Sequence, residues 1–218
     1  MPFNITKCHA MSFITTDTLP TYKLGQASIP WVDSTKYLGV TLQQDLNFDQ
    51  HISQKIDKAT KIFGAIKYTL NCAPIPSKLL AYTSLCRPIL KYADTLWDPA
   101  KKQTAEQIEN VQRKAVRFIS NLRGRESVSD ARQRLGLIPL ADRRKNHRIT
   151  LLLRILRDEQ CHHVLSSSYD EILKSRADAN MTIRAASKGE LTSIWAKSKL
   201  YYNSFLPQTI RDLRITKN

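Results

Sequence analysis

The stretch DQHISQKIDKATKIFGAIKYTL, residues 49–70, decides the fold, because here the spacing of apolar residues becomes that of a helix. Its apolar side chains recur at steps of three and four: Ile52, Ile56, Ala59, Phe63, Ile66 and Leu70. This period predicts one amphipathic helix with a buried stripe. Asp49 can cap its start, and the sequence APIP at residues 73–76 ends it.

The residues before this helix predict strands and turns. TYKLGQASIPWV (residues 21–32) and TKYLGVTL (residues 35–42) are rich in β-branched and aromatic residues, and Gly25 can make a turn. The strand residues of the second run are Tyr37, Leu38, Val40 and Leu42. We expect a β-hairpin or a small meander that packs on helices or on something missing from the chain, because an isolated hairpin is marginally stable in water.

The residues after it predict more helices. A second helix opens at Pro76 and carries Leu79, Leu80 and Leu85, and Pro88 bends or ends it. A third begins with a capping box and ends near a glycine at the C′ position; these residues are Thr104, Gln107 and Gly124. A short helix follows, which Ser127 and Asp130 can cap and which ends at Gly136. A long helix begins at about Leu140, and residues 166–190 read as loop with marginal helix.

The predicted fold class is therefore mainly α, with an N-terminal β-hairpin, a helical thumb-like bundle and a helical C-terminal region. The expected division of the chain is 1–45 for the hairpin part, 46–125 for the bundle and 126–218 for the basic C-terminal region. The chain has 218 residues, 42% hydrophobic, which suits a folded protein. Four scattered cysteines favour a reduced, intracellular protein, and no segment reaches the roughly 20 apolar residues of a membrane span.

Positive charge is the strongest feature of the composition. The formal net charge is +15, and residues 1–60 are balanced, so the excess begins with the helices. A partner with dense negative charge follows as a hypothesis, nucleic acid before a membrane surface, because neutralised phosphates release counterions. A basic surface that contacts only solvent is the alternative.

Two groups of cations carry this hypothesis. The first lies on the polar face and past the end of the third helix: Arg113, Lys114, Arg117, Arg123 and Arg125. The second opens the long helix, where cations oppose the helix dipole and a phosphate partner would offset the cost: Arg143, Arg144, Lys145 and Arg148. For each group, a solvated helix face is the alternative.

The residues give little support for catalysis or a metal site. The string Tyr92-Ala93-Asp94 resembles a polymerase YADD box, but Thr95 replaces the second carboxylate that paired Mg²⁺ ions require. Cys161-His162-His163 lacks a nearby second pair of zinc ligands. We therefore expect no catalytic residue, metal site or cofactor in this chain.

Five segments, in order, resemble the C-terminal part of non-LTR retrotransposon reverse transcriptases of the jockey and chicken-repeat type. The segments are FNITKCHAMSF, TKYLGVTLQQDLNFDQHI, AYTSLCRPILKYADTLWDP, IENVQRKAVRFI and YYNSFLPQTIRDL. The resemblance spans nearly the whole chain and is weakest at residues 166–200. The chain ends SFLPQTIRDLRITKN, where the family's tail carries a Trp-Asn pair and a closing Leu-Pro, which puts the docking of the last segment in doubt.

The resemblance implies roles by position. Lys7 matches a lysine near the incoming nucleotide at the end of the palm domain. The primer grip, the hairpin that holds the primer end, would comprise Tyr37, Leu38, Gly39 and Val40. The helices after Asp49 would form the thumb, which clasps the template-primer duplex, and Asp94 would belong to the thumb. In the full-length family enzyme, Mg²⁺ is held by a YADD box upstream of FNITKC, so the chain resembles a 5′-truncated element.

The expected function is thus that of a truncated RNA-directed DNA polymerase, inactive alone, which binds an RNA/DNA duplex mainly through phosphates. The alternatives are a non-catalytic module that binds a protein, such as the missing palm or a second copy, and an unselected remnant of a mobile element. Nucleus or cytoplasm, and RNA or DNA preference, stay open.

Overall fold

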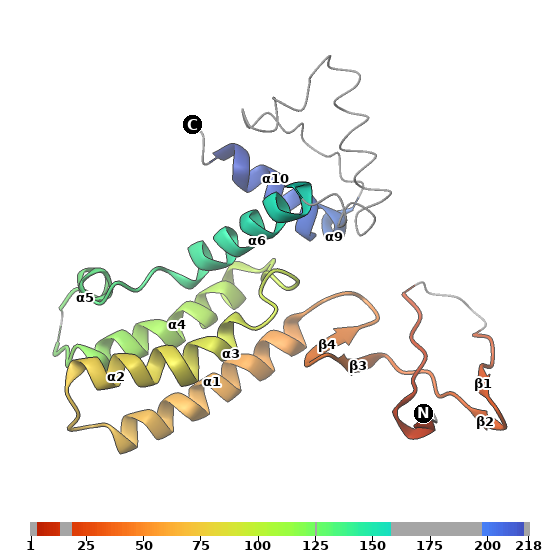
Figure 1. The fold of residues 1–218 in the computed structure, drawn as a ribbon, viewed down its shortest axis with the longest axis horizontal. Coiled ribbons are helices and arrows are strands. Elements are labelled where there is room, and N and C mark those ends of the chain that lie inside the picture. The colour runs from red at the N-terminus through yellow and green to blue at the C-terminus, as the bar shows by residue number, and fades with distance from the viewer. Residues whose placement is uncertain (1–3, 14–18, 125, 158–197, 216–218) are drawn as a thin grey trace, which may run out of the picture.

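The computed structural model describes residues 4–13, 19–124, 126–157 and 198–215, and within them the chain is mainly helical, as predicted. Two small β-hairpins come first, and helices follow (Figure 1). Three long helices, two of them in the bundle, and several short ones make up the described helical part.

The N-terminal part contains a short 3₁₀ helix, η1 (Ile5–Lys7), and two antiparallel hairpins. The first pairs β1 (Lys23–Leu24) with β2 (Ala27–Ser28), and the second pairs β3 (Ser34–Tyr37) with β4 (Val40–Gln43). The predicted hairpin is therefore confirmed. The placement of Leu38 in a strand was wrong, because Leu38 and Gly39 form the turn with φ angles of 46° and 80°.

Helix α1 (Asp49–Thr69) confirms the helix predicted from the opening stretch. Its N-cap residue is Phe48, without a side-chain cap, so Asp49 is the first helical residue and not the cap. Its carboxylate instead accepts a hydrogen bond from Lys101, 2.5 Å away. The predicted apolar stripe faces the core, where Ile52 and Phe63 are buried.

The second helical run continues through Pro88, where the sequence predicted a bend or an end. It consists of α2 (Ile75–Ala81), a π-helical turn η2 (Tyr82–Cys86) and α3 (Arg87–Lys91). The π turn supplies the reason, because widening the helix relieves the clash between a proline ring and the carbonyl one turn earlier. The buried face of the run carries Tyr82 and Cys86, whereas Leu80 and Leu85 are 66% and 56% exposed.

Helix α4 (Lys102–Ile119) starts two residues before the predicted capping box, so Thr104 and Gln107 do not cap it. Its C′ residue is Asn121, with φ of 50°, and not Gly124. The amide of Leu122 donates to the carbonyl of Arg117 at 3.0 Å, and that of Asn121 donates to Phe118 at 3.3 Å. These two bonds make a Schellman motif, in which asparagine tolerates the left-handed conformation.

Helix α5 (Val128–Arg134) is capped by Ser127, as predicted, and ends at Gly136 with φ of 63°. Helix α6 (Leu140–Arg157) begins where the sequence placed it. Two further helices follow, α9 (Lys199–Tyr202) and α10 (Phe205–Ile215); α10 packs against α6, and α9 contacts α10 (Figure 1). The predicted loop at residues 166–190 lies outside the described residues.

The main core forms where α1, the α2–η2–α3 run and α4 pack together. It includes Trp97 and continues to Ala131, Leu137 and Leu140. A smaller cluster joins α6 to α10 through Leu152, Leu206 and Ile210. A buried lysine, Lys78, spans α2 and the end of α4. Its ammonium donates to the Asn121 side chain at 2.8 Å and lies 4.7 Å from the centre of the Phe118 ring.

Candidate nucleic-acid interface

The turn between β3 and β4 is fixed to the helices by Tyr92. The Tyr92 hydroxyl donates to the carbonyl oxygen of Leu38 at 2.5 Å. The Lys55 ammonium donates to the carbonyl of Gly39 at 3.3 Å and lies 5.0 Å from the centre of the Tyr92 ring. A Cβ on Gly39 would lie 3.3 Å from that ring, so glycine allows both the turn and this close approach.

The base of the same hairpin is held by His51, a buried residue in the first turn of α1. The amide N–H of Thr41 donates to Nδ1 of His51 at 3.0 Å. Burial, and after it the positive charges of Lys55 and Lys36, together lower the pKa of His51 to about 4. His51 is therefore neutral near pH 7, the form in which Nδ1 can accept a hydrogen bond.

Three lysines surround this hairpin. The pKa of Lys55 is lowered, first by burial and then by the positive charges of Lys58 and Lys36. Lys36 and Lys58 are exposed, and so are two residues at the hairpin tip, Tyr37 at 63% and Leu38 at 74%. We call Lys36, Tyr37, Leu38, Lys55 and Lys58 the hairpin patch.

The lysines of the hairpin patch were missed in the sequence. Lys55 and Lys58 stand three residues apart on the polar face of α1, a spacing that could have indicated them. Lys36 alternates with the inward residue Thr35 on β3. The hairpin residues that the resemblance indicated, Tyr37 to Val40, do lie at this site, with Val40 buried beneath it.

The first predicted group of cations is accessible. Arg113, Lys114 and Arg117 are all exposed on α4, and Arg123 is exposed beyond its end. The Arg113 side chain donates to Asn110 at 2.8 Å. Arg125 lies outside the described residues.

The prediction that the second group faces a phosphate partner was wrong for Arg144 and Arg148. Their relative exposures are 2% and 3%, and both contact the carboxylate of Asp98, at 2.8 and 2.7 Å. Arg148 also pairs with Asp212 at 2.6 Å. The physical reason is that their acidic partners lie 46 to 64 residues away, out of reach of a local pattern. Arg143 and Lys145 are partly buried.

Two further predicted residues lie elsewhere. Lys7 is exposed at the end of η1, in the N-terminal segment that Figure 1 shows beside β1 and β2, apart from the helical bundle. Asp94 is buried, with 5% exposure, and its carboxylate lies 2.7 Å from Nδ1 of His147. Burial raises the pKa of Asp94, and the hydrogen bond to His147 opposes that shift.

In the ranges that the structure describes, no three His, Cys, Asp or Glu side chains are grouped closely enough to hold a metal ion. The Cys161-His162-His163 sequence lies outside these ranges. None of the described helices combines the length and apolar character needed to cross a membrane. No protein-family model, curated protein or solved structure matches this chain.

Proposed function

We propose that this chain is the primer-grip and thumb part of an RNA-directed DNA polymerase of a non-LTR retrotransposon. In this proposal it holds a nucleic-acid duplex mainly through phosphate contacts and performs no chemistry alone. The resemblance of the five sequence segments suggests the family, and the hairpin patch is the observation that carries the binding function.

The hairpin patch suits a nucleic-acid strand for two reasons. Its lysines supply positive charge that attracts phosphates, and its exposed Tyr37 and Leu38 offer apolar surface to a sugar or base. The turn is also held in place before any ligand binds, because Tyr92 and Lys55 bond its two carbonyl groups. A rigid site loses less conformational entropy on binding.

The cations of α4 extend the basic surface. Arg113, Lys114 and Arg117 are free of carboxylate partners among the described salt bridges, so their charge is available to a ligand. The position of Asp94 supports the other part of the proposal, that this chain performs no chemistry alone. Its carboxylate is buried against His147, a position from which it serves the fold and not a metal ion.

A salt titration of duplex binding tests the proposal. A fluorescent RNA/DNA duplex is titrated with the wild-type chain and with the double variant Lys36→Gln, Lys58→Gln, and anisotropy is followed at several salt concentrations. Each lost phosphate contact lowers the slope of log K against log salt by about 0.9. We expect the double variant to lose about 1.8 if each lysine contacts one phosphate.

The matched control is Lys23→Gln, Lys67→Gln, which also removes one lysine from a hairpin strand and one from α1. Both control lysines are exposed, and neither belongs to the hairpin patch. Equal slopes for the two double variants would reject the hairpin patch as the interface. No binding of duplex by the wild type at low salt would reject the proposed function itself.

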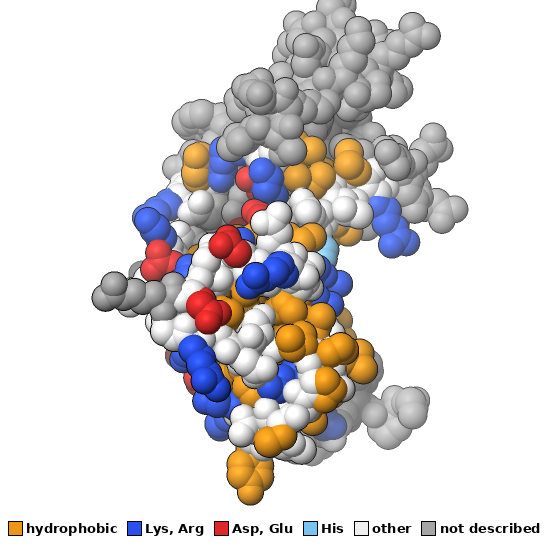
Figure 2. All heavy atoms as spheres, turned by 90° about the vertical axis from the view of Figure 1, so that its left-hand side faces the viewer, with side chains coloured by type: hydrophobic (Ala, Val, Ile, Leu, Met, Phe, Trp, Pro, Cys, Tyr) orange, Lys and Arg blue, Asp and Glu red, His pale blue; other side chains and the backbone are white. Residues whose placement is uncertain are grey.

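A protein-binding module is the second candidate, favoured by apolar side chains on the surface. Tyr68 is 91% exposed near the end of α1, and Leu80 and Leu85 are exposed on the run that follows. Figure 2 views the molecule from the end of the bundle at which α1 stops, and it shows apolar side chains gathered on this face. This candidate predicts association that persists in high salt and weakens in Leu80→Gln, Leu85→Gln, measured by sedimentation.

A further inference from the structure

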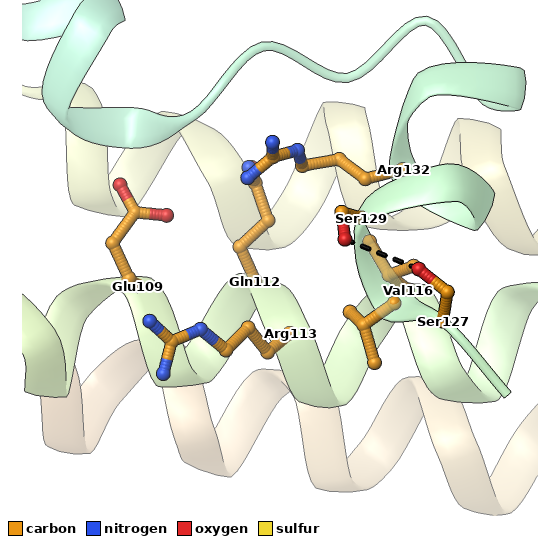
Figure 3. A pocket seen from close by; sticks show the side chains of 8 residues that line it. Glu109, Gln112, Arg113, Val116, Ser127, Ser129 and Arg132 are labelled. Atoms are coloured by element: carbon orange, nitrogen blue, oxygen red, sulfur yellow. Dashed lines mark hydrogen bonds between the residues drawn. The ribbon is translucent and has the colours of Figure 1, made fainter. Parts of the chain in front are cut away.

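A cavity of about 380 Å³ lies between α4 and α5, apart from the hairpin patch. Its polar lining comes from both helices and from the residues that start α5: Arg113, Ser127, Ser129 and Arg132, with Glu109 at one end. Figure 3 shows the Arg132 side chain reaching from α5 to Gln112, the Arg113 side chain extending along α4 below Glu109, and the two serine hydroxyls beside the start of α5. The sequence did not indicate Arg132, which lines the same cavity as Arg113 only through the packing of α5 on α4.

The charges in this cavity are not balanced within the described fold. Neither Arg113 nor Arg132 pairs with a carboxylate among the described salt bridges. The Glu109 carboxylate is already used, because it accepts the amide N–H of Ala141 at 2.7 Å. Two arginines and one glutamate leave a net positive charge facing the cavity.

Gln112, a polar residue in the wall of the cavity, already has hydrogen-bond partners within the fold. Gln112 donates to the carbonyl of Ile138 at 3.0 Å and accepts from the Tyr82 hydroxyl at 3.1 Å, so its side chain is held in place. The remaining donors are the two guanidinium groups, of which Arg113 already donates one N–H to Asn110 at 2.8 Å, and one hydroxyl of Ser127 and Ser129, because the other donates within this pair at 3.1 Å. Guanidinium forks and hydroxyls are the groups that bind phosphate oxygens.

We propose that this cavity binds one phosphate group of a nucleic-acid strand, which bridges Arg113 and Arg132. The inference rests on the proposed function and gives it a second, separate contact point. It also assigns α5 a role, since a bound phosphate would fasten this short helix to α4. Arg113 thus acts with Arg132 and not as part of a uniform basic face.

The test is the salt slope of duplex binding for Arg113→Gln, for Arg132→Gln and for the double variant. If the two arginines share one phosphate, replacing either of them or both removes the same single phosphate contact. Each variant, the double one included, should therefore lower the slope by about 0.9. The control is Arg134→Gln, which removes an exposed arginine of α5 that does not line the cavity; it should leave the slope unchanged.

Two results would overturn the inference. In the first, the slopes of the Arg113 and Arg132 variants equal that of Arg134→Gln. In the second, the double variant loses twice as much slope as each single variant, which would mean that the two arginines make separate surface contacts. Either result leaves the proposed function standing if the hairpin-patch variants still weaken binding. Nuclear magnetic resonance of the arginine side-chain N–H groups separates the sources of phosphate. We expect the signals of both arginines to shift with duplex. A shift with inorganic phosphate alone would mean a site for small phosphates and would also overturn the inference.

Discussion

The buried carboxylate of Asp98 should be one of the most sensitive positions of the fold. Its Oδ1 accepts from Nε of Arg144 at 2.8 Å, and its Oδ2 lies 2.7 Å from Arg148 and accepts from Gln208 at 2.6 Å. Both oxygens therefore face donors. In Asp98→Asn, the new NH₂ group must face one of these donors, and the negative charge between two buried arginines is lost.

The size of the effect follows from these contacts. Leaving a buried charge without its partner costs about 3–5 kcal/mol. Arg148 retains Asp212, and the Asp98 side chain is 14% exposed, so we expect the lower end, about 3 kcal/mol. In a chain of this size, that loss lowers the melting temperature by roughly 6–12 °C.

Urea unfolding followed by circular dichroism measures this loss. The control is Asp142→Asn, which removes an exposed carboxylate from the first turn of α6. We expect the control to lie within about 0.5 kcal/mol of the wild type. If Asp98→Asn lost less than about 1 kcal/mol, the ion cluster would not hold α6 and α10 in place, and the assignment of Arg144 to the fold would be refuted.

Three further predictions concern the hairpin. Tyr92→Phe removes the hydroxyl that donates to Leu38 and should cost about 1 kcal/mol of unfolding free energy, measured in urea; an unchanged stability would contradict a fixed turn. Gly39→Ala should cost more than Gly25→Ala in the same assay, because both have positive φ but only Gly39 faces a ring at 3.3 Å. The lowered pKa of His51 means that the unfolded state binds more protons between about pH 4 and 6.5, so stability falls as pH falls through that window, by up to about 1.4 kcal/mol per unit. His51→Asn should flatten this dependence in urea unfolding at several pH values, and an equally steep slope would assign it to another group.

Local patterns predicted the elements whose stability depends on nearby residues. The period of α1 and the cap at Ser127 are set within one or two helical turns, and both are confirmed. The same holds for the end of α5, which stops just before Gly136. The hairpin was predicted for the same reason, although Leu38 of its turn was assigned to a strand. Near the end of α4, Asn121 and Gly124 both adopt the left-handed conformation. Asn121, and not the predicted Gly124, closes the helix.

Features set by distant partners could not be predicted in this way. In the second run, Leu80 faces solvent and Tyr82 faces Gln112 of α4, and the choice between them is set by how the run packs against α4. The cations of α6 looked like surface residues because lysine and arginine are rarely buried unless paired. Arg144 and Arg148 are paired, and their carboxylate partners are Asp98 and, on α10, Asp212. The same limit hid Arg132, whose position depends on how α5 packs.

The segment KYADTLWDP shows how a string that resembles a catalytic motif can serve the fold instead. Tyr92 bonds the hairpin turn, Asp94 bonds α6, Trp97 is fully buried in the main core, and Asp98 joins α6 to α10. Four side chains of one short segment thus connect the second hairpin, the main core, α6 and α10. A carboxylate that binds catalytic metal ions must stay open to its substrate. Asp94 has the opposite requirement, because its hydrogen bond to α6 depends on being enclosed, and for that reason we expect its replacement to damage the fold before any binding activity.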